Sequence, residues 1–125
     1  MRAGEIGVEF KGMAIEVETR EKVTIIRPGE RLDLLSYAEL EEIFAEALAG
    51  GAEALVLDLH RVRYMNSSAI GVLQRYNEEA AAVGARLVVT RLSSEAAHIF
   101  KIVGLDRMLT VVADLDAALA QAAGA

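Results

Sequence analysis

The chain has 125 residues, 54% of them hydrophobic, and a mean hydropathy of +0.31, which suit a single domain with a substantial core. Its formal net charge of −6 argues against binding to nucleic acid or to anionic lipid, because both need a basic surface. The chain has no cysteine, no stretch typical of a signal peptide and no run of roughly 20 apolar residues, so we expect a soluble, cytoplasmic protein.

The first residues have the least defined pattern. Ile6, Val8 and Phe10 alternate with other residues, which is compatible with an edge strand or with a free N-terminal arm. We therefore assign residues 1–12 to an arm or edge strand and residues 13–122 to the domain itself.

A β-hairpin is expected next. Residues 13–19 alternate apolar and polar side chains, and residues 22–27 form a second strand-like run after a short turn. Pro28 follows the second run and ends it.

The first predicted helix has a clear start signal and a clear end. Ser36 and Glu39 have the spacing of a capping box, and Gly50 follows the helix. The apolar residues between them have helical spacing: Leu40, Ile43, Phe44, Ala47 and Leu48.

The rest of the chain alternates strands with helices. Strands are predicted at 54–59, 86–92 and 108–112, and the first of them is almost continuously apolar, as in a central buried strand. The helices are predicted from Asn66 to about Val83, from Ser93 to Gly104 and from Asp114 onward. The residues expected to face the core are Ile70, Leu73, Tyr76, Ala80 and Val83 in the first of these helices, and Ala96, Ile99, Phe100 and Val103 in the second.

The element order is therefore ββαβαβαβα. It predicts a single α/β domain with a mixed, mostly parallel sheet flanked by about four helices.

Enzymatic and metal chemistry find little support in the sequence. The two histidines, His60 and His98, are far apart, so we expect no metal site and no cofactor. Ser67 and His60 could in principle serve a small hydrolase, but no G-x-S-x-G turn is present. Asp58, near the end of the central strand, is interpreted as a hydrogen-bonding residue at a strand end.

The segment Tyr64–Gly71 (YMNSSAIG) is the most informative motif. Asn66 is a good N-cap, and Ser67 and Ser68 then occupy the first helical turn, where their role could be local hydrogen bonding alone. The functional interpretation is that small residues, Ala69 and Gly71, let another protein approach. A phosphate on Ser67 would be favoured by the helix N-terminus and would displace that protein.

The ordered motifs resemble the STAS domain of bacterial anti-sigma factor antagonists, from about Gly12 to Ala120. Residues 29–33 (GERLD) are similar to the family's G-x-L-D with one extra residue, and residues 64–71 resemble F-[ILM]-D-S-[ST]-G-[LI]-G. Gly84, Phe100, Gly104-Leu105 and residues 116–119 fit the family pattern as well. Asn66 and Ala69 depart from it, because the family has aspartate and glycine at these two places.

The resemblance implies a non-enzymatic partner switch. The unphosphorylated protein would bind an anti-sigma factor that is also a serine kinase, which frees a sigma factor. The kinase would phosphorylate Ser67, and a phosphatase would reset the protein. The 30–36 loop and the start of the helix after Asn66 would form the binding face, and the protein would be a monomer or weak dimer. The expected partner-binding residues are Asp33, Asn66, Ser67, Ser68, Ala69 and Gly71.

Two other hypotheses remain open at this stage. The first is a STAS scaffold or subunit of a signalling or lipid-transport complex without a phospho-switch, which the departures at Asn66 and Ala69 favour. The second is the small hydrolase, which would use Ser67 and His60.

Overall fold

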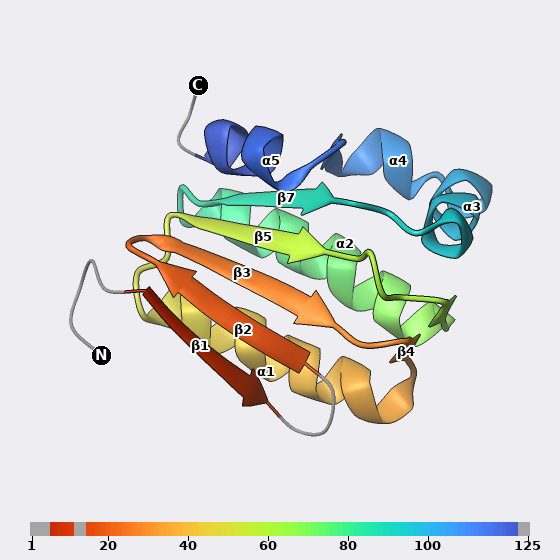
Figure 1. Cartoon of the computed structure of the whole chain (residues 1–125), viewed down its shortest axis with the longest axis horizontal. Helices are drawn as coiled ribbons and strands as arrows, with labels where there is room; N and C mark the ends of the chain where they lie inside the picture. The colour runs from red at the N-terminus through yellow and green to blue at the C-terminus, as the bar shows by residue number, and fades with distance from the viewer. Residues whose placement is uncertain (1–5, 12–14, 123–125) are drawn as a thin grey trace.

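The computed structural model describes residues 6–11 and 15–122, with the side chains of 6–11 left aside. Its centre is a six-stranded sheet in the order β1-β2-β3-β5-β7-β8 (Figure 1). The first three strands pair antiparallel, whereas β3, β5, β7 and β8 are parallel neighbours. The strands are β1 (Ile6–Lys11), β2 (Ile15–Arg20), β3 (Val23–Pro28), β5 (Ala54–Asp58), β7 (Arg86–Thr90) and β8 (Thr110–Val112).

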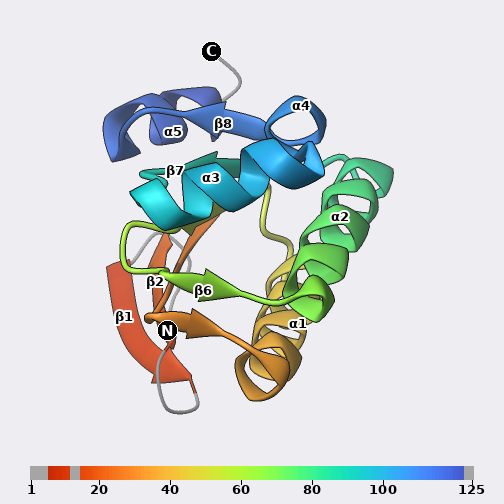
Figure 2. The ribbon, with the colours of Figure 1, turned by 90° about the vertical axis from the view of Figure 1, so that its right-hand side faces the viewer.

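Helices cover the two faces of the sheet unequally. α1 (Leu34–Ala49) and α2 (Ser67–Ala82) lie side by side on one face, and α5 (Leu115–Ala122) packs on the other. α3 (Ser94–Val103) and α4 (Leu105–Met108) connect β7 to β8 at one end of the sheet (Figure 2). This is the mixed, mostly parallel α/β architecture expected from the sequence. None of the helices in the described ranges is long and apolar enough to cross a membrane.

The larger core lies between the sheet and the α1–α2 pair. Phe44 of α1 and Tyr76 of α2 meet there with ring centroids 5.0 Å apart. The inward residues of the central strand β5, Leu55 and Leu57, are fully buried beneath them. A smaller core on the opposite face joins Val56 of the same strand to Ala118 of α5. The residues of β5 are almost all apolar because the strand is buried on both faces.

Three details of the predicted elements were wrong. α1 begins at Leu34, with Asp33 and not Ser36 as its N-cap. Val83 and Val103 do not face the core: they are 66% and 41% exposed. Met108 ends the short helix α4, which the sequence did not predict, and the last strand begins only at Thr110.

Other boundaries were predicted correctly. Ser93 and Asp114 cap α3 and α5, where their side-chain oxygens accept bonds from Ala96 N (3.0 Å) and Ala117 N (2.8 Å). Gly104 ends α3 with a φ of 80°, a backbone conformation that strongly favours glycine.

Candidate partner-binding site

Two very short strands bring distant parts of the chain together. β4 (Arg31–Leu32) and β6 (Tyr64–Met65) pair in parallel, and each leads directly into a helix, α1 or α2 (Figure 2). The amide of Asn66 donates to the carbonyl of Leu32 at 3.1 Å. The N-termini of α1 and α2 are therefore held next to each other, and the two segments expected to share a surface are adjacent.

The N-terminus of α2 is capped by a neutral side chain. Asn66 has extended backbone angles, and its Oδ1 accepts a bond from the amide of Ala69 at 3.1 Å. The amides of Ser67 and Ser68 belong to the first turn and have no acceptor within the helix. Ser67 itself is exposed, and Ser68 is half-buried. The tip of α2 thus presents a hydroxyl beside amide groups that attract negative charge.

The two small residues of the motif have different positions. Ala69 is fully buried and packs in the main core, which corrects the expectation that its methyl group faces an approaching partner. Gly71, one turn after Ser67, is exposed, and a Cβ added there would meet no atom within 4 Å. Of these two small residues, only Gly71 therefore leaves open space at the tip of α2.

The N-terminus of α1 is capped by a charged side chain. Asp33 Oδ1 accepts from the amide of Ser36 at 3.4 Å, and Ser36 Oγ accepts in return from the amide of Asp33 at 3.0 Å. The amide and the hydroxyl of Ser36 both donate to the Asp33 carboxyl, and these two bonds hold its pKa below the ordinary value. The tip of α1 therefore already carries an anion, unlike the tip of α2.

Exposed apolar residues surround the two helix tips. Leu34 and Leu35, in the first turn of α1, are 65% and 78% exposed, and Tyr64 of β6 is 42% exposed. The guanidinium of Arg31 lies 4.3 Å from the centroid of the Tyr64 ring. We call Leu34, Leu35, Tyr64, Ser67 and Gly71 the tip surface. The two leucines lie in the 30–36 segment that was expected to form part of the binding face, but they were not named as site residues, although their position outside the apolar phase of the helix could have revealed them.

The segment from His60 to Asn66, which leads to α2, is anchored at Asp58. This aspartate is fully buried, and its Oδ1 accepts from the backbone amide of His60 at 3.2 Å and lies 2.8 Å from His60 Nδ1. Its Oδ2 accepts from Arg91 Nε at 3.1 Å, while Arg27 Nε lies 3.4 Å away. Asp58, Arg27, His60 and Arg91 form what we call the Asp58 cluster. The interpretation of Asp58 as a strand-end hydrogen-bonding residue is confirmed.

The charge of Asp58 is stabilised by its partners. Burial opposes ionisation, but the hydrogen bonds from Arg91 and His60 outweigh it, so the pKa of Asp58 lies below its ordinary value of 3.8. Arg91 adopts a φ of 52°, which is uncommon for a residue with a side chain. The cluster thus fixes the end of β5 through contacts with β3 and with the residue after β7.

A second set of contacts ties the segment after Asp58 to α3. Ser93 Oγ donates to the carbonyl of Val62, and Arg63 Nη1 lies 2.9 Å from Glu95 Oε2.

Within the described residues no group of three or more histidines or carboxylates could hold a metal ion. His98 is exposed on α3, far in the chain from His60, whose Nδ1 faces Asp58.

Both the sequence and the structure are similar to those of known proteins. The sequence pattern of the STAS domain matches residues 14–118. An anti-sigma-B factor antagonist of Staphylococcus aureus is 26% identical over 97 residues, which cover 78% of this chain and 90% of that protein. The anti-sigma-F factor antagonist RsfB of Mycobacterium tuberculosis is 28% identical over 107 residues, covering 86% of this chain and 87% of RsfB.

A solved structure shows the same fold. The crystal structure of an anti-sigma factor antagonist from Mycobacterium paratuberculosis superposes with a TM-score of 0.76. The alignment covers 95% of each chain at 21% sequence identity, so this likeness concerns the fold.

Proposed function

The chain belongs to the STAS domain family, and on this basis we propose that it is an anti-sigma factor antagonist controlled by phosphorylation of Ser67. In this proposal its partner is an anti-sigma factor with serine kinase activity, in the cytoplasm. The observation that carries it is the exposed Ser67 hydroxyl at the tip of α2, next to the apolar residues of the tip surface.

The tip surface suits a reversible contact with a protein. Leu34, Leu35 and Tyr64 offer exposed apolar area, which is the usual energetic centre of a protein interface. Asp33, Asn66 and Ser68 are the polar residues at its edge. The kinase bound there would have released its sigma factor, which would then be free for transcription.

A phosphate on Ser67 would reverse the contact. It adds a charge of about −1.5 to −2, which the unpaired amides of the first turn of α2 stabilise. The same charge would lie within the apolar interface, where the partner would have to bury it at a large cost in free energy. Removal of the phosphate by a phosphatase would restore binding. In this cycle the antagonist is the substrate and catalyses nothing.

The proposal is tested with the purified kinase and ATP. Ser67→Ala is expected to bind the kinase as the wild type does and to accept no phosphate, whereas Ser67→Asp is expected to lose affinity. Ser68→Ala, one residue further along the helix, serves as the matched control and should still be phosphorylated. Phosphorylation of the Ser67→Ala variant at the wild-type rate would show that Ser67 is not the acceptor.

A second candidate function rests on the departures at Asn66 and Ala69. The family's aspartate would place a charge beside the acceptor serine, and Asn66 provides the cap without that charge. A STAS scaffold or subunit of a signalling or lipid-transport complex would need no phospho-switch. Mass spectrometry of the protein from its own host would distinguish the two, because the scaffold would lack a phosphorylated species.

A further inference from the structure

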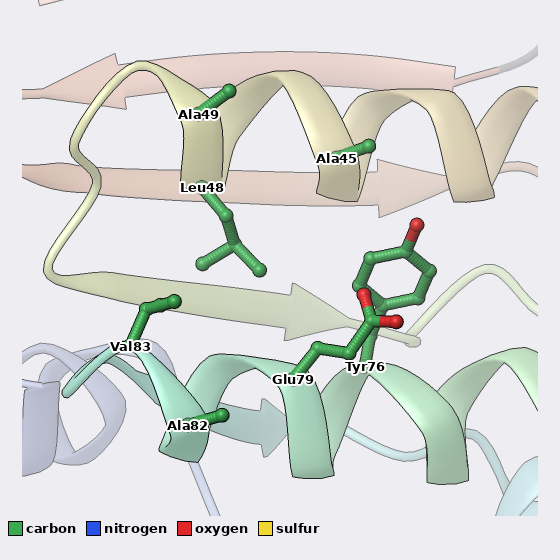
Figure 3. Close-up of a pocket in the computed structure, with 7 residues that line it drawn as sticks. All are labelled: Ala45, Leu48, Ala49, Tyr76, Glu79, Ala82 and Val83. Atoms are coloured by element: carbon green, nitrogen blue, oxygen red, sulfur yellow. The ribbon is translucent and has the colours of Figure 1, made fainter.

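A furrow of about 400 Å3 lies between the C-terminal halves of α1 and α2. Figure 3 shows the side chains of Leu48, Glu79 and Tyr76 directed into the space between the two helices. Small and apolar residues make up most of its walls, which consist of Ala45, Leu48, Ala49, Tyr76, Glu79, Ala82 and Val83. Ser67 lies at the opposite end of α2, so the furrow is separate from the tip surface.

The two helices that form the furrow carry most of the net charge of the protein. α1 has four glutamates and no lysine or arginine, and α2 has two glutamates and one arginine. Together they contribute a formal charge of −5 to the chain's −6. Glu42 and Glu78 are exposed at helical spacings of three and four residues before Ala45 and Ala82, at the borders of the furrow. The apolar furrow therefore has acidic borders.

The ends of the helices add to this negative potential. The C-terminus of a helix carries a partial negative charge that a lysine or arginine in the last turn commonly offsets. Neither α1 nor α2 has a basic residue in its last turn. Both C-termini lie at the furrow, where a cation from another molecule would meet them.

Arg75 shows how a guanidinium binds on this surface. Its Nη2 lies 2.6 Å from Glu41 Oε1 of α1, and its Nε lies 3.4 Å from Glu79 Oε1 of α2. The same guanidinium lies 5.0 Å from the centroid of the Tyr76 ring, the aromatic wall of the furrow. A single arginine thus bridges both helices at the end of the furrow nearer to Ser67.

We propose that the α1–α2 furrow is the docking site for a basic amphipathic helix of a partner protein. Apolar side chains of that helix would enter the furrow between Ala45 and Ala82, in the manner of a helix packed in a groove. Its lysines and arginines would pair with the acidic borders, as Arg75 does within the chain. This contact goes beyond the proposed phospho-switch, because it uses a surface at the other end of α2.

The experiment uses the full chain and a defined probe. A short, fluorescein-labelled amphipathic helix of leucine and lysine is titrated with the protein and followed by fluorescence anisotropy. A counterpart with glutamate in place of lysine is the reference and is expected not to bind. In ¹⁵N spectra the lysine peptide should shift the amides of the furrow, near Leu48 and Val83, and leave those of the tip surface unchanged.

Two exposed positions test the site itself. Glu79→Lys should weaken binding of the lysine peptide about tenfold at low salt. Ala45→Gln, which fills the furrow without a change in charge, should weaken it several-fold. The matched control Asp116→Lys makes the same charge change on α5, on the opposite face of the sheet, and should bind as the wild type does. Ser67→Asp should also bind normally, which separates this test from that of the phospho-switch.

Two results would overturn the proposal. Equal weakening by Asp116→Lys and Glu79→Lys would mean that an acidic protein attracts a basic peptide without any particular site. Self-association in sedimentation experiments that Ala45→Gln abolishes would mean that a second copy of the chain, and not a basic helix, covers the furrow.

Discussion

The Asp58 cluster and the tip surface lie at the same end of the molecule and are built in opposite ways. In the cluster, the charged groups are paired, Asp58 with Arg91 and His60, and Arg27 also with Glu16 and Glu18, and Asp58 is fully buried. On the tip surface, Leu34, Leu35 and Ser67 are exposed. Only the segment from Leu59 to Asn66 separates Asp58 from Ser67 in the chain.

The difference indicates a division of labour. Buried, paired charges hold a strand end in one conformation, because breaking such a pair leaves an uncompensated charge. Exposed apolar groups and a hydroxyl contribute little to the fold and remain available to a partner. Changes in the cluster should therefore affect stability first, whereas changes to the exposed side chains of the tip surface should affect binding first.

The largest effect is expected from Asp58→Ala. It leaves Arg91 without its carboxylate partner and removes one of the carboxylates around Arg27, which keeps Glu16 and Glu18, so the free energy of unfolding should fall by about 2–3 kcal/mol. Urea denaturation followed by circular dichroism measures this loss. Asp116→Ala, which removes an exposed carboxylate of α5, is the control and should change stability little. If both variants unfold at the same urea concentration, the cluster does not hold the fold.

Acidification should cause part of the same loss. Besides Asp58, Glu18 has a lowered pKa: burial raises it, but hydrogen bonds from Arg20 and Arg27 more than offset this. Groups with a lowered pKa in the folded state stabilise it at neutral pH, and this contribution disappears as the pH falls through the ordinary values of 4.5 and 3.8 and below. The melting temperature should therefore decrease below about pH 4.5.

A variant makes this pH effect specific. Asp58→Asn has no carboxylate at position 58 that acid could protonate. Its melting temperature should therefore depend less on pH than that of the wild type. If the melting temperature of Asp58→Asn falls as steeply at acid pH as that of the wild type, other carboxylates cause the decrease. The measurement is a series of thermal melts between neutral pH and the acid limit of folding.

Changes to the exposed leucines of the tip surface should weaken binding and leave stability nearly unchanged. Leu34→Ser combined with Leu35→Ser should weaken binding of the anti-sigma kinase by about 2 kcal/mol, or roughly 30-fold. Stability should change by less than about 0.5 kcal/mol, because both side chains are largely exposed. Ile102→Ser, at a residue of α3 with 69% exposure, is the control and should bind normally. Equal losses in the control would indicate nonspecific hydrophobic contact.

The sequence could predict the layers of the fold but not every contact at the site. Strand and helix order follow from periodicity, which each segment carries by itself. The S-x-x-E pattern that begins at Ser36 matches the common capping box and predicts the start of α1 there. The structure uses Asp33 instead, since the pairing of β4 with β6 holds the preceding residues extended. That pairing joins segments about thirty residues apart, and no local pattern reveals it.

Only the end of the buried face of α2 was predicted wrongly, for a different reason. Ile70, Leu73, Tyr76, Ala80 and Val83 were expected to face the core. The first four are buried or pack against the main core, whereas Val83, the C-cap residue, is 66% exposed. The buried set is Ala69, Val72, Leu73, Tyr76 and Ala80, which has helical spacing as well. Small residues such as Ala69 give a weak hydrophobic signal, so only packing against the sheet shows that Ala69 and Val72 belong to this face and Val83 does not. The partners of Asp58 could not be predicted from the sequence either, because Arg27 and Arg91 are distant from it in the chain.

The smallest and most discriminating prediction concerns Gly71. Glycine inside a helix is less stable than alanine by about 1 kcal/mol, and a Cβ at this position would meet nothing within 4 Å. Gly71→Ala should therefore raise the free energy of unfolding by about 0.5–1 kcal/mol. If a partner packs closely on the tip surface, the added methyl group should at the same time reduce its affinity several-fold.

The reverse change provides the matched control for Gly71→Ala. Ala81→Gly, at an exposed position nearer the C-terminus of α2, should lose about as much stability as Gly71→Ala gains, and should leave the affinity for the kinase unchanged. Opposite effects on stability and binding would place Gly71 within the interface, because no contact inside the protein accounts for a loss of affinity there. A Gly71→Ala variant that is more stable and binds as tightly as the wild type would remove Gly71 from the tip surface and confine the contact to the β4–β6 side.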